Sequence, residues 1–146
     1  MSEQSSRELL ARLVGFATVS RDSNLELIGF IRDYLASHGV HSELIYNPER
    51  TKANLFASIG PEDRGGVVLS GHTDVVPVDG QAWSVEPFVL SEREGRLYGR
   101  GTADMKGFIA SVLAAVPGLT RRRLRLPVHL AFSYDEEVGC LGVRPM

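Results

Sequence analysis

Apolar residues in the first part of the chain recur at the spacing of an amphipathic α-helix. The pattern predicts one helix from Ser6 to about Ala17 and a second helix whose N-cap is Ser23. The segment Ser23-Asn-Leu-Glu26 has the form of a capping box, and Gly39 is placed to end the second helix in a left-handed turn. The apolar faces consist of Leu9, Leu10, Leu13, Val14 and Ala17 in the first helix, and of Leu27, Ile28, Ile31, Tyr34 and Leu35 in the second.

Short apolar segments in the middle of the chain are typical of strands. We expect strands at residues 41–46 and 54–59, with a turn at Asn47-Pro48 between them. The continuous apolar run Val67–Leu69 is typical of a strand buried inside an α/β sheet. Residues 88–98 are predicted to form two short elements around a hairpin turn at Glu94-Gly95.

The last third of the chain continues this alternation of helices and strands. A helix is predicted from Met105 to about Val116, where Pro117-Gly118 would stop it. A basic loop at residues 121–125 leads to a nearly continuous apolar strand from Leu126 to Tyr134, which we expect to be central in its sheet. The alternation indicates a layered α/β domain.

Composition and charge narrow the class of protein. The chain has 146 residues, 43% of them hydrophobic and 23% charged, and a formal net charge of -2, so no strong field attracts nucleic acid or anionic lipid. No apolar run approaches the roughly 20 residues that span a bilayer, and the first residues lack the apolar stretch of a signal peptide. Because Cys140 is the only cysteine, no internal disulfide forms, and a cytoplasmic protein is expected.

The first group of polar residues that suggests chemistry directly follows the Val67–Leu69 strand. It reads Ser-Gly-His72-Thr-Asp74, and residues two apart in extended chain point to the same side. That spacing fits a metal-bound imidazole oriented by a carboxylate. A turn histidine beside an Asx turn at Asp74 explains the same residues without a metal.

Two further segments are equally open when each is taken alone. Asp104 precedes a predicted helix, so it suits either a metal or the helix N-cap. Asp135, Glu136 and Glu137 follow a predicted central strand, and three acids in a row usually form a solvated edge. One glutamate can nevertheless bind metal while its neighbour faces a water molecule, because adjacent side chains point in different directions. All three segments follow predicted strands or precede a helix, which favours a common site.

Taken together, these motifs resemble those of one known family. The stretches LSGHTDVVPVDGQAWS (residues 69–84), GRLYGRGTADMKGFIASVLAAV (95–116) and SYDEEVGC (133–140) are similar to the matching parts of acetylornithine deacetylases. These enzymes belong to a broader family of co-catalytic zinc exopeptidases and amidohydrolases, which also contains succinyl-diaminopimelate desuccinylases, carboxypeptidase G and aminoacylases. The resemblance implies an α/β/α sandwich around a mixed, mostly parallel sheet.

The resemblance also implies a role for each of the candidate residues. His72 would bind one metal ion, Asp104 would bridge two ions, and Glu137 would bind the other ion. Asp74 would hold the imidazole in place, and Glu136 would be the general acid/base. The ions would be divalent, with zinc or cobalt expected. The family further implies a cis peptide bond directly after Asp104.

The reaction implied is hydrolysis of N2-acetyl-L-ornithine to L-ornithine and acetate, a step in arginine biosynthesis. The partner would be a small N-acyl amino acid rather than nucleic acid or membrane. A desuccinylase or a metallodipeptidase of the same family remains an alternative, as does a metal-binding protein without catalysis.

The sequence departs from the family in one respect. The family pattern has five metal ligands, and this sequence contains three of them. We therefore expect residues 1–146 to be the amino-terminal portion of the catalytic domain, without the lid domain through which family members dimerise. Each ion would lack one protein ligand, so negligible activity is expected of this chain alone.

Overall fold

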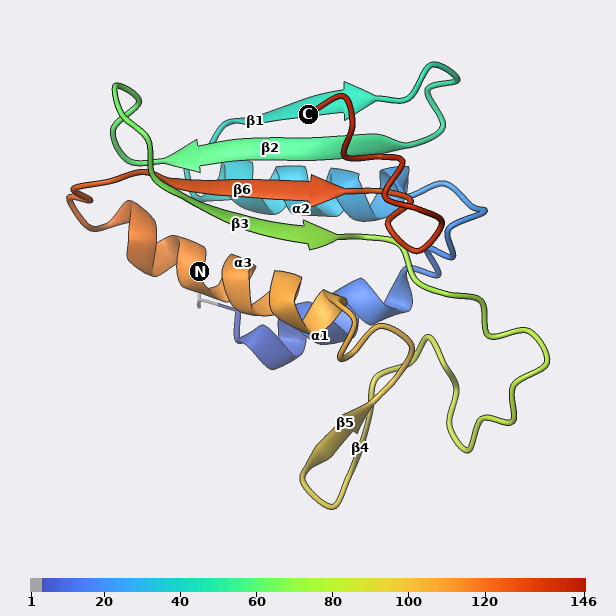
Figure 1. Cartoon of the computed structure of the whole chain (residues 1–146). Helices are drawn as coiled ribbons and strands as arrows, with labels where there is room; N and C mark the ends of the chain where they lie inside the picture. Colours follow the sequence, from blue (N-terminus) through green and yellow to red (C-terminus); the bar gives the residue numbers. More distant parts are fainter. Residues whose placement is uncertain (1–3) are drawn as a thin grey trace.

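The computed structural model describes residues 4–146, which form three helices, a four-stranded sheet and a two-stranded hairpin (Figure 1). The hairpin belongs to the long segment between residues 72 and 106 and projects away from the sheet. The helices are α1 (Ser6–Gly15), α2 (Leu25–Ser37) and α3 (Lys106–Thr120), and the strands are β1 (Ser42–Tyr46), β2 (Ala53–Ile59), β3 (Val67–His72), β4 (Ser91–Arg93), β5 (Arg96–Tyr98) and β6 (Val128–Ser133).

The four-stranded sheet has the order β1-β2-β6-β3. Strands β1 and β2 pair antiparallel, as do β2 and β6, whereas β3 and β6 pair parallel. The expected α/β class, the mixed sheet and the interior position of β6 are thus confirmed. In the described residues two of the three pairings are antiparallel, so the sheet is not mostly parallel as expected. The parallel pair is the one that matters for chemistry, because it aligns the carboxyl ends of β3 and β6 with His72 beside Ser133.

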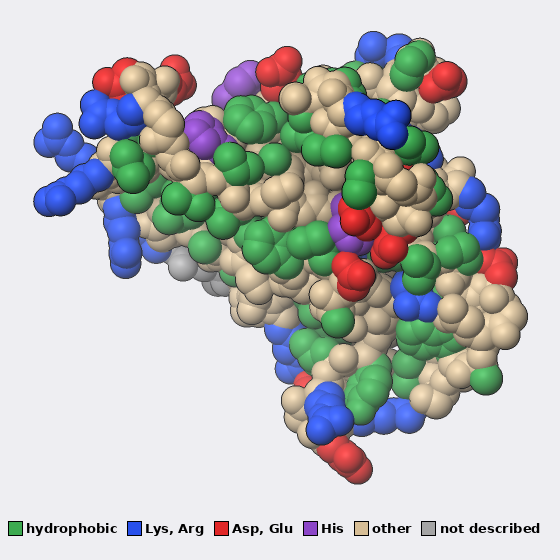
Figure 2. Space-filling model, in the orientation of Figure 1, with side chains coloured by type: hydrophobic (Ala, Val, Ile, Leu, Met, Phe, Trp, Pro, Cys, Tyr) green, Lys and Arg blue, Asp and Glu red, His purple; other side chains and the backbone are tan. Residues whose placement is uncertain are grey.

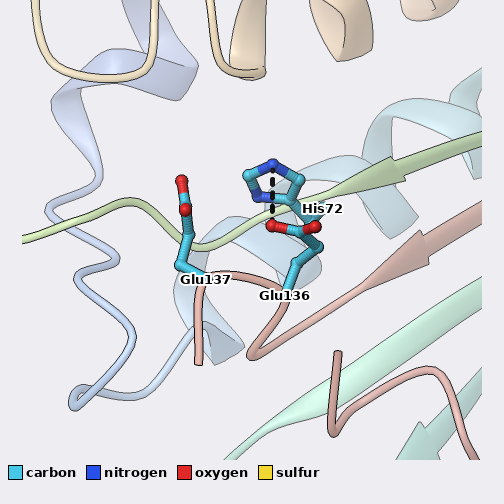
Figure 3. A group of neighbouring side chains, drawn as sticks. All are labelled: His72, Glu136 and Glu137. Carbon is cyan, nitrogen blue, oxygen red and sulfur yellow. Dashed lines mark ion pairs between the residues drawn. The ribbon is translucent and has the colours of Figure 1, made fainter. Parts of the chain in front are cut away.

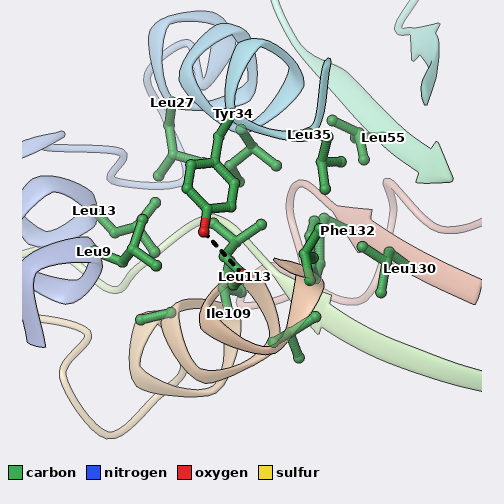
Figure 4. Packing of buried hydrophobic residues seen from close by; sticks show 14 of the residues in the cluster. Leu9, Leu13, Leu27, Tyr34, Leu35, Leu55, Ile109, Leu113, Leu130 and Phe132 are labelled. Atoms are coloured by element: carbon green, nitrogen blue, oxygen red, sulfur yellow. Dashed lines mark hydrogen bonds between the residues drawn. The ribbon is translucent and has the colours of Figure 1, made fainter. Parts of the chain in front are cut away.

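The three helices share one hydrophobic core with one face of this sheet (Figure 4). Leu55 of β2 lies opposite Phe132 of β6 in the register, and both side chains are fully buried against the helices. Each such side chain contributes about 1.5–3 kcal/mol through burial. The apolar positions predicted for the first two helices are buried as expected, except Ala17, which lies beyond α1. The second helical layer of the expected α/β/α sandwich is not formed by residues 4–146.

Helix capping differs from the sequence prediction. The capping box lies at the start of α1, where the Ser5 hydroxyl accepts from the backbone N–H of Glu8 and the Glu8 carboxylate accepts from Ser5. The box predicted at Ser23 is wrong, because α2 begins after Asn24 and has no side-chain cap. The Asn24 side chain instead forms two hydrogen bonds with the backbone of Ala53: its Nδ2 donates to the carbonyl, and its Oδ1 accepts from the N–H. The Asn24 side chain therefore joins the start of α2 to strand β2 and does not cap its own helix.

Strand β3 was expected to be buried, and this expectation is wrong. Val67 and Val68 are 55% and 54% exposed, because β3 is one of the two edge strands of the sheet in the described residues. The strand also runs three residues further than predicted, so that His72 is its last residue rather than part of the following loop.

Helix α3 does not stop at Pro117 but continues to Thr120. A proline inside a helix has no N–H to donate to the carbonyl four residues earlier, here that of Leu113. The hydroxyl of Tyr34 donates to this carbonyl at 3.1 Å (Figure 4). A side chain of α2 thus satisfies the group that the proline leaves unpaired, and the helix can continue.

Two local predictions are confirmed. Strands β4 and β5 form the expected hairpin, whose turn residues Glu94 and Gly95 both have positive φ angles, 52° and 71°. Gly39 ends α2 with a φ of 74°. In the part of the chain that the structure describes, no helix is long and apolar enough to cross a membrane.

The contact between Tyr34 and Leu113 can be tested with a pair of substitutions. Tyr34→Phe removes the donor to a buried carbonyl and should lower the free energy of unfolding by about 1 kcal/mol. In a Pro117→Ala background the new backbone N–H at position 117 can serve the same carbonyl, so the loss should fall to a few tenths (~0.3 kcal/mol). Urea unfolding of the four proteins measures this coupling. Equal losses in both backgrounds would show that the hydroxyl does not compensate for the proline.

Candidate metal centre

The predicted site residues meet where the chain leaves β3 and β6 and enters α3. The parallel pairing places the end of β3 beside the end of β6. The loop after β6 then turns back, so that Glu136 and Glu137 lie next to His72 (Figure 3). Figure 2 shows acidic side chains gathered beside a histidine on this face of the molecule. A separate pocket, whose lining includes His38, His41 and Phe56, contains none of the predicted site residues.

His72 is buried, and its two ring nitrogens face different partners. Nδ1 lies 2.9 Å from the backbone carbonyl oxygen of Asp74. Because a carbonyl only accepts, this contact places a proton on Nδ1 and leaves Nε2 for another partner. Nε2 lies 3.0 Å from the carboxylate of Asp104 and 3.7 Å from that of Glu136. A protonated His72 ring therefore donates from Nε2 to the Asp104 carboxylate, whereas a neutral ring offers the lone pair of Nε2 to a metal ion.

The carboxylate of Asp74 binds more groups than the sequence suggested. It lies 3.5 Å from His72 Nδ1, but its shorter contacts are with other loops. One oxygen accepts from the hydroxyl of Ser20 at 2.6 Å, and the two oxygens accept from the backbone N–H groups of Glu136 and Glu137 at 3.1 and 3.2 Å. Burial raises the pKa of Asp74, but the hydrogen bonds outweigh it and bring the pKa to about 2. Asp74 is therefore a charged group that joins three loops.

Three side chains offer donor atoms that lie within 4.8 Å of one another: His72, Glu136 and Glu137. Glu136 belongs to this group although the resemblance implied that it is the acid/base rather than a ligand. The predicted bridging residue, Asp104, is outside the group, but it contacts His72 Nε2 and its side chain is 74% exposed. Asp104 is not a helix cap, because Met105 occupies the N-cap of α3. The peptide bond between Asp104 and Met105 is cis, as the resemblance implied.

The charge balance of this cluster favours a cation. Burial raises the pKa of Glu137, and the carboxylates of Asp104, Glu136 and Asp74 raise it further, whereas His72 opposes them. Nitrogen and carboxylate oxygen donors around an excess of negative charge suit zinc or a similar divalent ion. The arrangement thus offers donor atoms that can hold a divalent cation.

A known protein family matches this chain. The model of peptidase family M20/M25/M40 matches residues 68–146, more than half of the chain. The chain belongs to this family. The family recognition made from the motifs is confirmed.

Curated relatives of this M20 chain include three bacterial acetylornithine deacetylases. The protein from Pasteurella multocida (strain Pm70) is 46% identical over 123 residues, which cover 84% of this chain and 32% of the relative. The protein from Proteus mirabilis (strain HI4320) is 39% identical over 144 residues, with 94% and 37% covered. The chain thus spans about a third of the length of these relatives.

Solved structures of M20-type enzymes have the same fold. Human carnosine dipeptidase 1 matches 94% of this chain with a TM-score of 0.81 and 25% identity, and the match covers 33% of that protein. An M20 family metallo-carboxypeptidase from Sulfolobus solfataricus matches 97% of this chain with a TM-score of 0.82 at 24% identity, which supports the fold alone.

The structure also reveals buried polar residues that the sequence analysis of this M20 chain missed. The Lys106 side chain is fully buried, donates from Nζ to the backbone carbonyl of Phe16, and has its pKa lowered to about 7 by burial. Asn54 joins β2 to the last loop by donating to the Gly142 carbonyl and accepting from the N–H of Tyr134. The available signals were a polar residue inside an apolar strand, at Asn54, and a charged residue at the start of an apolar helix, at Lys106.

The pKa of His72 gives a pH-dependent prediction for the metal-free M20 chain. Burial opposes the charged ring, but the contacts with Asp74 and Asp104 outweigh it and raise the pKa from 6.5 to about 9. The imidazole signals of His72 should therefore titrate with a midpoint well above pH 6.5 in an NMR experiment. Added Zn²⁺ should lower that midpoint, because the metal and the proton compete for Nε2.

The same shift predicts how stability depends on pH. Since the folded pKa lies above the unfolded one, charged His72 stabilises the fold fully below pH 6.5, and this contribution is lost as the pH rises through about 9. A His72→Asn variant should lack this decline in unfolding free energy. A midpoint at or below pH 6.5 in the metal-free protein would contradict the ion pairing.

Proposed function

We propose that this chain forms the metal-binding part of an amide hydrolase that acts on N-acylated amino acids, with N2-acetyl-L-ornithine as the substrate. The observation that carries the proposal is the 39–46% identity to three acetylornithine deacetylases, over 84–94% of this chain. The products would be L-ornithine and acetate. The convergence of His72, Glu136 and Glu137 supports the chemistry but does not choose the substrate.

In this proposal His72, Asp104 and Glu137 would hold two divalent ions, zinc or cobalt, and Asp104 would be the ligand that both ions share. Once His72 has lost its proton, the lone pair on Nε2 and the carboxylates around it suit such ions. When bound, the ions polarise the amide carbonyl and lower the pKa of a water molecule towards ~7. The chain itself keeps the donors in place through the contacts of Asp74.

Glu136 is the proposed general acid/base. Its side chain is 43% exposed and lies beside His72, so it can reach both the centre and an incoming substrate. It would accept a proton from the attacking water and return this proton to the leaving nitrogen. Asp74 would act through His72 and through the loop of the two glutamates, without touching the substrate.

The rest of the proposal concerns the setting of this site. We infer that residues 1–146 form the amino-terminal portion of a catalytic domain, because the chain matches about a third of the solved relatives. The partner would be a small N-acyl amino acid in the cytoplasm, and dimerisation would use a separate domain. A dipeptidase is the second candidate, supported by the likeness to human carnosine dipeptidase 1.

A chimaera can separate these substrates. Residues of this chain would replace the matching part of the Pasteurella multocida relative, with the remainder of that relative kept. The proposal predicts that kcat/KM for N2-acetyl-L-ornithine exceeds that for a β-alanyl dipeptide or N-succinyl-diaminopimelate by at least about 100-fold, about 3 kcal/mol. The parent relative is the matched control. A preference for the dipeptide would support the second candidate instead.

The role of Glu136 predicts a further result in the same chimaera. Glu136→Gln keeps the size of the side chain but removes its ability to accept a proton, so kcat should fall by about 10²–10⁴-fold. Metal content measured by atomic emission should stay the same, since position 136 is outside the proposed ligand set. Substantial residual turnover would remove this residue from the mechanism.

A further inference from the structure

The turn that carries the two glutamates has a strained backbone. Asp135, which directly precedes them, has a φ of 55°, in the left-handed region that disfavours residues other than glycine. Such a conformation costs about 1 kcal/mol or more and persists only where surrounding contacts enforce it. The direction in which Glu136 and Glu137 leave the strand depends on this residue.

The carbonyl of Asp135 accepts from the N–H of Leu141, and its carboxylate is held by Lys52, which lies 83 residues earlier. Lys52 Nζ is 2.6 Å from the Asp135 carboxylate, and only 15% of each side chain is exposed. The same ammonium group donates to the backbone carbonyl of Ser20 at 2.5 Å. An ion pair that is largely buried and has a second hydrogen bond stabilises its geometry more than an exposed surface pair does.

These contacts close a ring behind the donor atoms. Ser20 donates to the Asp74 carboxylate, which accepts from the backbone N–H groups of Glu136 and Glu137. Asp135, directly before these glutamates, accepts from Lys52, and Lys52 also donates to the carbonyl of Ser20, which completes the ring. The ring joins the loop after α1, the loop after β3, the loop after β6 and the residue before β2. None of its links involves the atoms offered to the metal.

We propose that Lys52 is a positioning residue of the metal centre, which fixes the turn at Asp135 and thereby the two glutamates against His72. The inference rests on the proposed function, because it concerns the metal that this centre would hold. Lys52 does not touch metal or substrate. It acts by keeping the donor atoms close together before a metal arrives, so that binding does not have to order the turn.

The experiment measures Zn²⁺ affinity of the full chain by competition with a chelating dye. Lys52→Met keeps most of the side chain but removes its charge, and it should weaken affinity by about 10-fold or more. Lys52→Arg keeps the charge and should recover most of the loss. The control is Arg64→Met, which removes a similar but exposed ion pair with Asp63 and should leave affinity unchanged.

Asp135→Gly separates positioning from stability. Glycine adopts a φ of 55° without strain, so this variant loses the carboxylate but keeps the fold, as checked by circular dichroism and thermal unfolding. Its Zn²⁺ affinity should fall about as far as that of Lys52→Met. Because the variant does not depend on Lys52→Met being folded, it keeps the test decisive.

The outcomes are distinct. If the parent binds Zn²⁺ and both Lys52→Met and Asp135→Gly bind it within about twofold of the parent, the inference is wrong while the metal centre stands. If the variants lose only thermal stability, Lys52 is an ordinary structural ion pair and the inference is likewise wrong. If the parent binds no Zn²⁺, the proposed function fails and this inference fails with it.

Discussion

The buried carboxylate of Asp74 is the group on which the geometry of this centre depends. A charged group withdrawn from water must be fully hydrogen-bonded, because an unpaired one is strongly destabilising. Asp74 meets this requirement with donors from Ser20, Glu136 and Glu137, which belong to two other loops. The loops cannot separate without leaving the charge unpaired. A requirement of solvation therefore fixes the relative position of the candidate metal donors.

Other buried polar residues extend the same principle. Thr73 donates to the carbonyl of Ser133 and accepts from Asn24, and Thr18 donates to the carbonyl of Thr73. Loops that pass through the interior have backbone groups without a ladder partner, and these side chains satisfy them. The helices and one sheet face are held by apolar burial, whereas the end of the sheet is held by directed hydrogen bonds. Stability and site geometry thus come from two different parts of the molecule.

This division explains what the sequence could and could not predict. The periodicity of apolar residues is local, so the helices, the hairpin and most strands were predicted correctly, and the motifs named the residues that meet around His72. The continuation of α3 through Pro117 depends on Tyr34, which lies 79 residues away from its acceptor. The exposure of Val68 depends on which strand pairs with β3. Lys52 and Ser20 carry no motif, and their contacts follow from tertiary structure alone.

The residues of the candidate centre differ widely in exposure. Asp104 and Glu136 have side chains that are 74% and 43% exposed, whereas those of His72 and Asp74 are 5% and 3% exposed. A group that must meet a substrate cannot be buried, and an exposed side chain on a loop is not ordered by its own packing. Its position has to be imposed through the backbone. The hydrogen bonds from the glutamate turn to Asp74 impose it directly, and Lys52 restrains Asp135, the strained residue that directly precedes the two glutamates.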